Sequence, residues 1–218
     1  EEHLTMLEEA KKRDHNKLGR ELELFTTSDV IGQGLPILLP KGARIVQLLQ
    51  RFVEDEEQRR GWLLTKTPFM AKSDLYKISG HWDHYKDGMF VLGDEEKDKE
   101  VFALRPMTCP FQYQAYLNRK RSYRDLPLRY FEFGTVYRHE MSGVVHGLLR
   151  ARGFTQDDAH IFCTKDQVVD EVVAILELVD YIMGTFGFTY EAEISTRPDK
   201  SIGTDDMWEH ATESLKEA

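Results

Sequence analysis

Two neighbouring segments carry chemically active side chains at the alternating spacing of a β-strand. In FTQDDAHIFC, residues 154–163, alternation places Phe154, Gln156, Asp158 and His160 on one face. A face that combines a carboxylate, an amide and an imidazole is costly to bury without partners. We therefore expect this face to line a cavity or cleft, although an exposed sheet face would show the same pattern.

The preceding predicted strand, YFEFGTVYRHE at residues 130–140, places Arg138 and Glu140 on a common face. A guanidinium presents a planar fork that matches phosphate oxygens, and a carboxylate accepts a hydrogen bond from an amino group. The pair therefore suits a nucleotide. An ordinary cross-strand ion pair would have the same spacing.

Cys109 and His160 offer the thiolate and imidazole that zinc favours. They lie far apart in the sequence, so an ordinary buried cysteine and a hydrogen-bonded histidine explain them equally well. The sequence contains none of the local motifs H-E-x-x-H, paired C-x-x-C, G-x-x-x-x-G-K or G-x-G-x-x-G. Any metal or phosphate site must therefore be assembled by the fold.

Composition limits the classes of protein to consider. The 218 residues are 41% hydrophobic with a net charge of -9, enough for one large domain with a core and too apolar for a disordered chain. No stretch approaches the roughly 20 apolar residues of a membrane span, and residues 1–20 do not resemble a signal peptide. Only Cys109 and Cys163 are present, which favours a reducing, cytoplasmic compartment over a disulfide scaffold.

The elements that must position these residues follow from hydrophobic periodicity and turn signals. Pro40 to Gly42 is expected to form a turn, and Gly61 to end the helix before it. Strands joined by short loops predict antiparallel pairs, so we expect an α+β fold with helices against an antiparallel sheet. The expected helices are 1–24, 43–60, 109–121, 164–187 with a Thr164/Gln167 capping box, and a last helix capped by Thr204. The expected strands are 35–39, 62–67, 90–92, 101–104, 130–140, 153–163 and 188–194.

Six blocks of the sequence are long enough to make chance agreement with a known family implausible. They are KKRDHNKLGRELELF (11–25), GHWDHYKDGMF (80–90), RPMTCP (105–110), SYRDLPLRYFEFGTVYRHEMSG (122–143), HGLLRARGFTQDDAHIFC (146–163) and STRPDKSIGTDDMW (195–208). Together they resemble the threonyl-tRNA synthetases, a family of class II aminoacyl-tRNA synthetases. The resemblance implies the family's antiparallel sheet flanked by helices, with a linker helix at 1–25 and the N-terminal part of the catalytic domain at 26–218, truncated before motif 3.

The same resemblance implies threonine activation with Mg-ATP and transfer to tRNA(Thr), and it assigns residues to ATP. Arg138 would hold the α-phosphate as a catalytic residue, and Arg150 would be a second phosphate contact. Glu140 would bind the adenine amino group, and Phe154 would stack on the adenine ring. The loop from His139 to Gly147 would approach the tRNA acceptor end.

For threonine, the resemblance implies that Gln156 lies near the α-phosphate and the threonine carboxylate as a catalytic residue. Asp158 would accept a hydrogen bond from the threonine hydroxyl, and Met107 would belong to the same pocket. His81 resembles the histidine that assists transfer to the tRNA ribose. The helix at 43–60 and the strand ending at Pro68 resemble motif 1, which implies a homodimer.

Cys109 and His160 resemble two of the family's three zinc ligands. The zinc ion would bind the amino and hydroxyl groups of threonine and reject valine, which an apolar pocket separates by only about a hundredfold. The third ligand, a histidine far downstream, would lie beyond Ala218, and His210 falls in a different segment. We therefore expect residues 1–218 alone to bind zinc weakly and to have little or no aminoacylation activity.

Two alternatives compete with the synthetase hypothesis. A synthetase-like binding or regulatory module would keep the fold without aminoacylation, but it would not need the ATP, threonine and metal residues together. A zinc hydrolase using Cys109 and His160 would need a local ligand pair and a general base, which the sequence lacks. A basic cluster is a weaker candidate for nucleic-acid binding, since a solvated helix end has the same composition. It consists of Arg119, Lys120, Arg121, Arg124 and Arg129.

Overall fold

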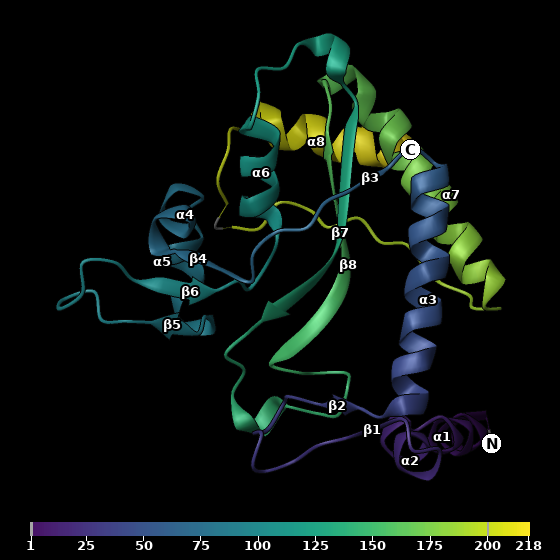
Figure 1. The fold of residues 1–218 in the computed structure, drawn as a ribbon. Helices are drawn as coiled ribbons and strands as arrows, with labels where there is room; N and C mark the ends of the chain where they lie inside the picture. Colours follow the sequence, from purple (N-terminus) through teal and green to yellow (C-terminus); the bar gives the residue numbers. More distant parts are fainter. Residues whose placement is uncertain (1, 200) are drawn as a thin grey trace. The chain divides into compact units, whose positions relative to one another are not determined.

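The computed structural model describes residues 2–199 and 201–218. It contains helices and small sheets in an α+β arrangement, which confirms the predicted fold class (Figure 1). The chain divides into two compact units, and we describe each by itself. The first comprises residues 1–119 and 130–160, and the second comprises residues 120–129 and 161–218.

The first unit begins with two helices, α1 (Glu2–Lys12) and α2 (His15–Glu21), where the sequence pattern predicted one. The reason for the break is Asp14, whose carboxylate accepts the Asn16 backbone N–H at 3.0 Å and caps α2. Two short antiparallel strands follow, β1 (Phe25–Thr26) and β2 (Ile37–Leu38).

The next helix, α3 (Pro40–Arg59), begins where the sequence pattern predicted a turn. That prediction was wrong because proline fits the first turn of a helix, where its missing N–H is not needed. Gly61 follows the helix with a φ of 87°, a conformation that favours glycine. The short strand β3 (Leu63–Leu64) then pairs in parallel with β7 (Leu128–Tyr137).

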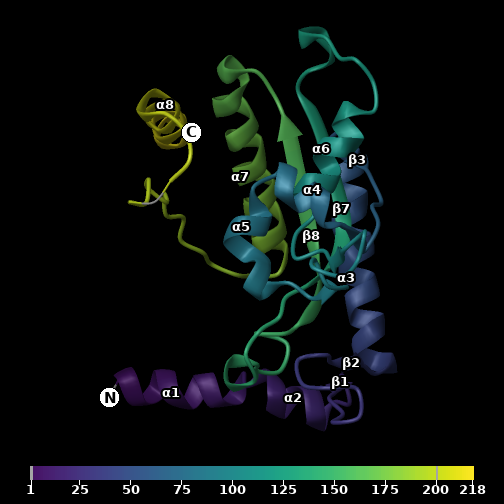
Figure 2. The same cartoon turned by 90° about the vertical axis from the view of Figure 1, so that its left-hand side faces the viewer.

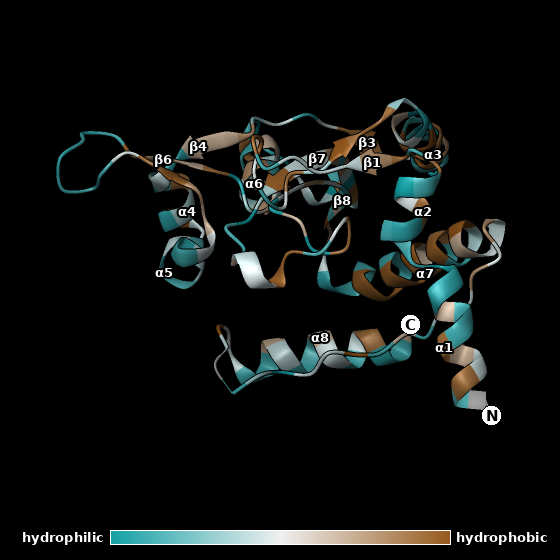
Figure 3. Ribbon diagram, turned by 90° about the horizontal axis from the view of Figure 1, so that it is seen from below, coloured by the Kyte–Doolittle hydropathy of each residue, from teal (hydrophilic) through white to brown (hydrophobic). Residues whose placement is uncertain are grey.

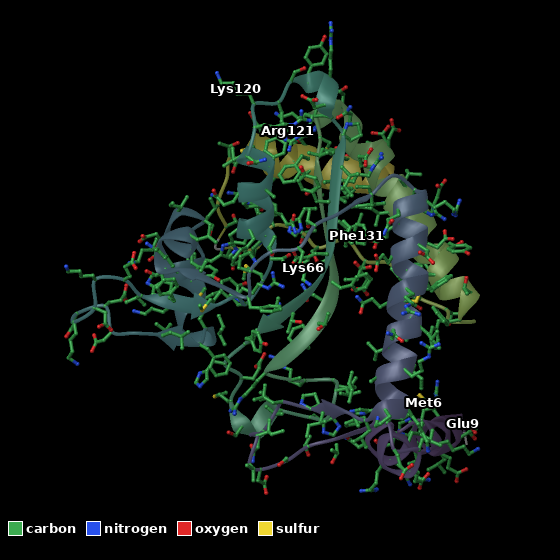
Figure 4. The ribbon with its side chains drawn as sticks, viewed as in Figure 1. Met6, Glu9, Lys66, Lys120, Arg121 and Phe131 are labelled. Atoms are coloured by element: carbon green, nitrogen blue, oxygen red, sulfur yellow. The ribbon has the colours of Figure 1, made fainter. Side chains whose placement is uncertain are left out.

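The larger sheet has the strand order β3-β7-β8, with β8 spanning Gly153–Phe162. Phe131 of β7 is fully buried (Figure 4). The two long strands start and end within three residues of the predicted ranges, because their periodicity and turn signals are both strong. Four of the predicted site residues, Phe154, Gln156, Asp158 and His160, lie on β8. Arg138 and Glu140, predicted to lie on a strand, come just after the end of β7.

A second sheet has the order β4-β6-β5, and all its pairs are antiparallel. It confirms the predicted hairpin around the acidic tip and adds β4, which the sequence analysis did not predict. Two unpredicted helices, α4 and α5, pack here as well (Figure 2). The bounds are β4 (Met70–Lys72), α4 (Ser73–Ile78), α5 (His81–Tyr85), β5 (Val91–Leu92), β6 (Phe102–Leu104) and α6 (Cys109–Leu117).

The buried cluster of the first unit lies around this second sheet. Its members come from α4, α5, α6, β6 and the loops beside the strands, so short elements with weak individual signals share one core. The cluster contains Tyr76, Trp82, Met89, Val101, Ala103 and Phe111.

The second unit contains α7 (Val168–Thr185) and α8 (Asp205–Glu217), which contact each other. The predicted Thr164/Gln167 capping box and Thr204 cap are both present. Figure 3 shows α7 as largely hydrophobic. The predicted strand at 188–194 is absent from this part of the described chain, because the segment pairs with no other strand.

None of the helices in the described ranges is both long and apolar enough to cross a bilayer.

Candidate functional site

A buried ion pair anchors the segment that organises the candidate site. Arg105 and Glu132 are 1% and 2% exposed, and the Arg105 Nη1 atom lies 2.6 Å from the Glu132 Oε1 atom. Arg105 also donates to the Thr135 carbonyl at 2.7 Å and to the Thr67 hydroxyl at 2.5 Å. A buried ion pair is tolerated when hydrogen bonds satisfy its remaining groups, as they do here.

This anchor fixes residues 105–109 against β7 and β8. The Pro106 carbonyl accepts a hydrogen bond from Arg138 Nε at 3.2 Å, and the Thr108 hydroxyl donates to the Asp158 carboxylate. Gly134 makes room for Thr108, because a Cβ at that position would lie 2.6 Å from the Thr108 Cγ2 atom. One short segment therefore orients both a guanidinium and a carboxylate of the predicted site.

Four of the predicted ligand-binding residues line one cavity of about 320 Å³. Glu140 and Arg150 form an ion pair in its wall, with Arg150 Nη2 at 3.1 Å from Glu140 Oε2. The cavity therefore offers two guanidinium groups, one carboxylate and an apolar side, which is the chemistry that binds a nucleotide. The four residues are Met107, Arg138, Glu140 and Arg150.

Phe154 lies beside this group through Arg138, whose guanidinium carbon is 5.2 Å from the centre of the Phe154 ring. The ring lines a different, more apolar hollow that also includes Tyr137 and Thr155. His81 does not line the cavity that contains Arg138 and Glu140. Its ring contacts that of Tyr85, which does, at 6.1 Å, and the Ser79 hydroxyl lies 2.8 Å from His81 Nδ1.

The remaining predicted residues gather around Asp158. Gln156 donates to the Asp158 Oδ2 atom at 2.9 Å, so this oxygen receives hydrogen bonds from two residues. Burial and the Asp158 charge together raise the pKa of the Cys109 thiol. Burial lowers the pKa of His160, while the charges of Asp158 and Glu132 oppose that effect. Asp158 therefore acts electrostatically on both predicted metal ligands.

His160 has one feature that bears directly on metal binding. Its Nδ1 atom is buried and has no hydrogen-bond partner among the described residues, and its ring meets Tyr113 edge-on with the centres 6.4 Å apart. A buried ring nitrogen without a partner is costly, and a ligand would remove that cost. Across residues 2–199 and 201–218 no three His, Cys, Asp or Glu side chains form a ready metal site. Cys109 and His160 are donor types that zinc accepts, and among the described residues they belong to no cluster of three such donors.

Several contributing residues were not predicted. Thr108 and Arg105 lie in a block that the sequence analysis used only for resemblance, and their roles depend on contacts across the fold. Glu132 had a signal, because a carboxylate in an otherwise apolar strand needs a partner. Of the basic cluster, Arg129 is engaged elsewhere, since it forms a two-pronged ion pair with Glu171 at 2.5 Å.

The sequence is similar to known proteins over most of its length. A family model described as the tRNA synthetase class II core domain (G, H, P, S and T) matches residues 90–212, more than half of the chain. The threonine–tRNA ligase of Clostridium perfringens is 60% identical over 221 residues, which cover 99% of this chain and 34% of that protein. That of Thermotoga petrophila is 50% identical over 216 residues, covering 99% and 33%.

A solved structure of a threonyl-tRNA synthetase domain is also similar to this chain. The crystal structure of the RNA binding domain of threonyl-tRNA synthetase from Cryptosporidium parvum matches with a TM-score of 0.86 and 40% identity, covering 94% of this chain and 50% of that one. The chain spans about a third of the length of the curated relatives it matches. The resemblance to threonyl-tRNA synthetases is thus confirmed, and the chain belongs to the family of class II tRNA synthetase core domains.

Proposed function

We propose that this chain forms part of the active site of a threonine–tRNA ligase, which activates threonine with ATP and transfers it to tRNA(Thr). The observation that carries the proposal is the segment 105–109. It contacts Arg138 beside the nucleotide cavity through Pro106 and contacts Asp158 through Thr108. Two substrates that must react with each other would be held by residues on one rigid segment.

In the activation step, the threonine carboxylate would attack the α-phosphate of ATP, the bond from the α-phosphorus to the bridging oxygen would break, and pyrophosphate would leave. Negative charge develops on the phosphate oxygens during this displacement. Arg138 carries a fixed positive charge at the cavity wall and would stabilise that charge. Mg²⁺ would accompany ATP. Glu140 would accept from the adenine amino group, and Phe154 would stack on the ring. Arg150 is paired with Glu140 in the structure and has an exposed side chain, so it can turn to a phosphate.

For threonine, Asp158 would accept the hydroxyl hydrogen bond, because Thr108 and Gln156 occupy its Oδ2 atom and leave Oδ1 for a substrate. Cys109 and His160 would hold a zinc ion together with a ligand from outside the described residues. Zinc, when bound, supplies an electrophile that requires an oxygen ligand and so excludes valine. The unpartnered His160 Nδ1 atom supports this assignment.

The wider assignments are also part of the proposal. The loop that contains residues 139–147 would approach the acceptor end of the tRNA, and His81 would assist transfer. A homodimer through α3 is supported by exposed apolar side chains on that helix. Free Cys109 and Cys163 are compatible with a cytoplasmic location. The exposed large hydrophobic side chains of α3 are Ile45, Val46, Leu48 and Leu49.

The direct test is amino-acid-dependent exchange of pyrophosphate into ATP by the full-length protein. Threonine should stimulate exchange, valine should not, and serine should do so weakly. The same assay after removal of zinc by a chelator should show a loss that zinc restores. Exchange that no amino acid stimulates, with ATP still bound, would instead favour a synthetase-like binding or regulatory module.

A further inference from the structure

The N-terminal helix α2 contacts the loop between β7 and β8, far away in the sequence. The backbone N–H of Leu148 donates to His15 Nε2 at 3.2 Å. Beside it, Asn16 Nδ2 lies 3.2 Å from His146 Nε2, and the rings of His15 and His146 meet edge-on with centres 5.3 Å apart. Figure 2 shows α2 next to this loop.

The contact indicates which tautomer of the His15 ring is present. A backbone N–H can only donate, so His15 Nε2 must be the unprotonated nitrogen, and the proton of the neutral ring belongs on Nδ1. The titratable groups facing the ring are His146 and Asp14, whose Oδ1 atom lies 4.0 Å from His15 Nδ1. The ring also stacks on Phe25, with 6.0 Å between the centres.

Gly147 makes the close approach possible. Its φ is 51°, and a Cβ at this position would overlap the His15 ring nitrogen and the Asn16 side-chain oxygen. The loop therefore approaches α2 more closely than a side chain at position 147 would allow, and its backbone conformation is one that glycine adopts at little cost.

The loop on the other side of this contact carries Arg150. His146 and Arg150 exchange backbone hydrogen bonds of 3.0 and 3.1 Å, which close the turn of residues 146–150. The ends of the turn are thus joined to each other, and its tip is joined to α2. The position of Arg150 at the cavity therefore depends on the hydrogen bonds between His146 and Arg150 and on the contact of the turn with α2.

We propose that His15 is a positioning residue, which fixes the 146–150 turn through Leu148 and so holds Arg150 at the ATP site. The proposal rests on the assignment of Arg150 as a phosphate contact. His15 touches no substrate. Its role would make the helix that precedes the catalytic domain a determinant of ATP affinity.

The experiment compares three variants of the full-length protein. His15→Phe keeps the ring that stacks on Phe25 but removes the nitrogen acceptor. His15→Gln restores a hydrogen-bond acceptor, because its side-chain oxygen lies three bonds from Cβ, as Nε2 does in histidine. His3→Phe is the control, since His3 is an exposed histidine on the neighbouring helix α1.

Two readouts are used, and neither requires threonine activation. Calorimetry gives the Kd for ATP, and hydrogen exchange followed by mass spectrometry reports the amides of residues 146–150. His15→Phe should weaken ATP binding about fivefold, as expected for one lost hydrogen bond, and should speed amide exchange in the turn. His15→Gln should recover most of both losses, and His3→Phe should change neither.

Faster amide exchange with an unchanged Kd for ATP would overturn the proposal, because the contact would then be structural only. Unchanged exchange in the turn would overturn it too. Gly147→Ala provides an independent check, since it disrupts the same contact from the loop side and should reproduce the effects of His15→Phe. If ATP binds as expected but threonine stimulates no pyrophosphate exchange, the proposed function fails and this inference about ATP does not.

Discussion

Glu57 provides a quantitative test of the electrostatics of the first unit. This α3 side chain is 2% exposed, and its Oε2 atom has no hydrogen-bond partner among the described residues. Burial, followed by the charges of Asp157 and Glu54, raises the pKa of Glu57 from 4.5 to about 8. Near neutral pH the folded state therefore holds a proton that the unfolded chain would release.

The raised pKa of Glu57 makes the unfolding free energy depend on pH. A carboxyl whose folded pKa is raised contributes most to stability below its unfolded pKa of 4.5, and that contribution is lost as the pH rises toward 8. At about pH 7 the loss amounts to about 3 kcal/mol, from 1.36 kcal/mol per pKa unit. Glu57→Gln keeps the shape without the ionisation, so it should be more stable than the wild type by that amount at neutral pH.

The assay is urea unfolding of wild type and Glu57→Gln at about pH 5, pH 7 and pH 8.5. The difference in unfolding free energy should be small at the lowest pH and grow with pH. Asp55→Asn, an exposed position on the same helix, should show no such growth. A pH-independent difference between wild type and Glu57→Gln would refute the reasoning, since it would mean that Glu57 ionises alike in both states.

The remaining predictions concern the proposed site, and each applies to the full-length protein. Cys109→Ser should lower the zinc-to-protein ratio, measured by plasma mass spectrometry, together with threonine activation; an unchanged ratio would exclude Cys109 as a ligand. Arg138→Ala should reduce pyrophosphate exchange at least about a hundredfold with the thermal midpoint unchanged. Asp158→Asn should raise the KM for threonine more than that for ATP, and equal increases would count against its assignment. Thr108→Val, which keeps the side-chain shape, should raise the KM for threonine about fivefold, and Thr108→Ser should restore it.

The sequence predicted the long strands and the faces of their side chains because burial of one sheet face imposes a strict alternation. It also predicted the Thr164 and Thr204 caps, which depend on residues three positions apart. The prediction failed where contacts with residues distant in the sequence determine the secondary structure. Residues 188–194 have a strand-like composition but pair with no strand, and α4 and α5 are too short to show a helical period.

The same distinction holds for the candidate site. Arg138, Glu140 and Arg150 meet in one cavity, as the resemblance implied. The residues that orient the candidate site could not be predicted, because Thr108 contacts Asp158 and His15 contacts Leu148 only in the folded chain. Supporting contacts of this kind leave no periodic signal in the sequence.

The buried Arg105–Glu132 pair has a consequence for how mutational data on this domain should be interpreted. The pair supports a segment that contacts Arg138, the proposed phosphate residue, and Asp158, the proposed threonine residue. If those assignments hold, a substitution at Arg105 would impair binding of both proposed reactants, although Arg105 is assigned to neither of them. An alanine scan alone would then misidentify a structural residue as one that binds substrate.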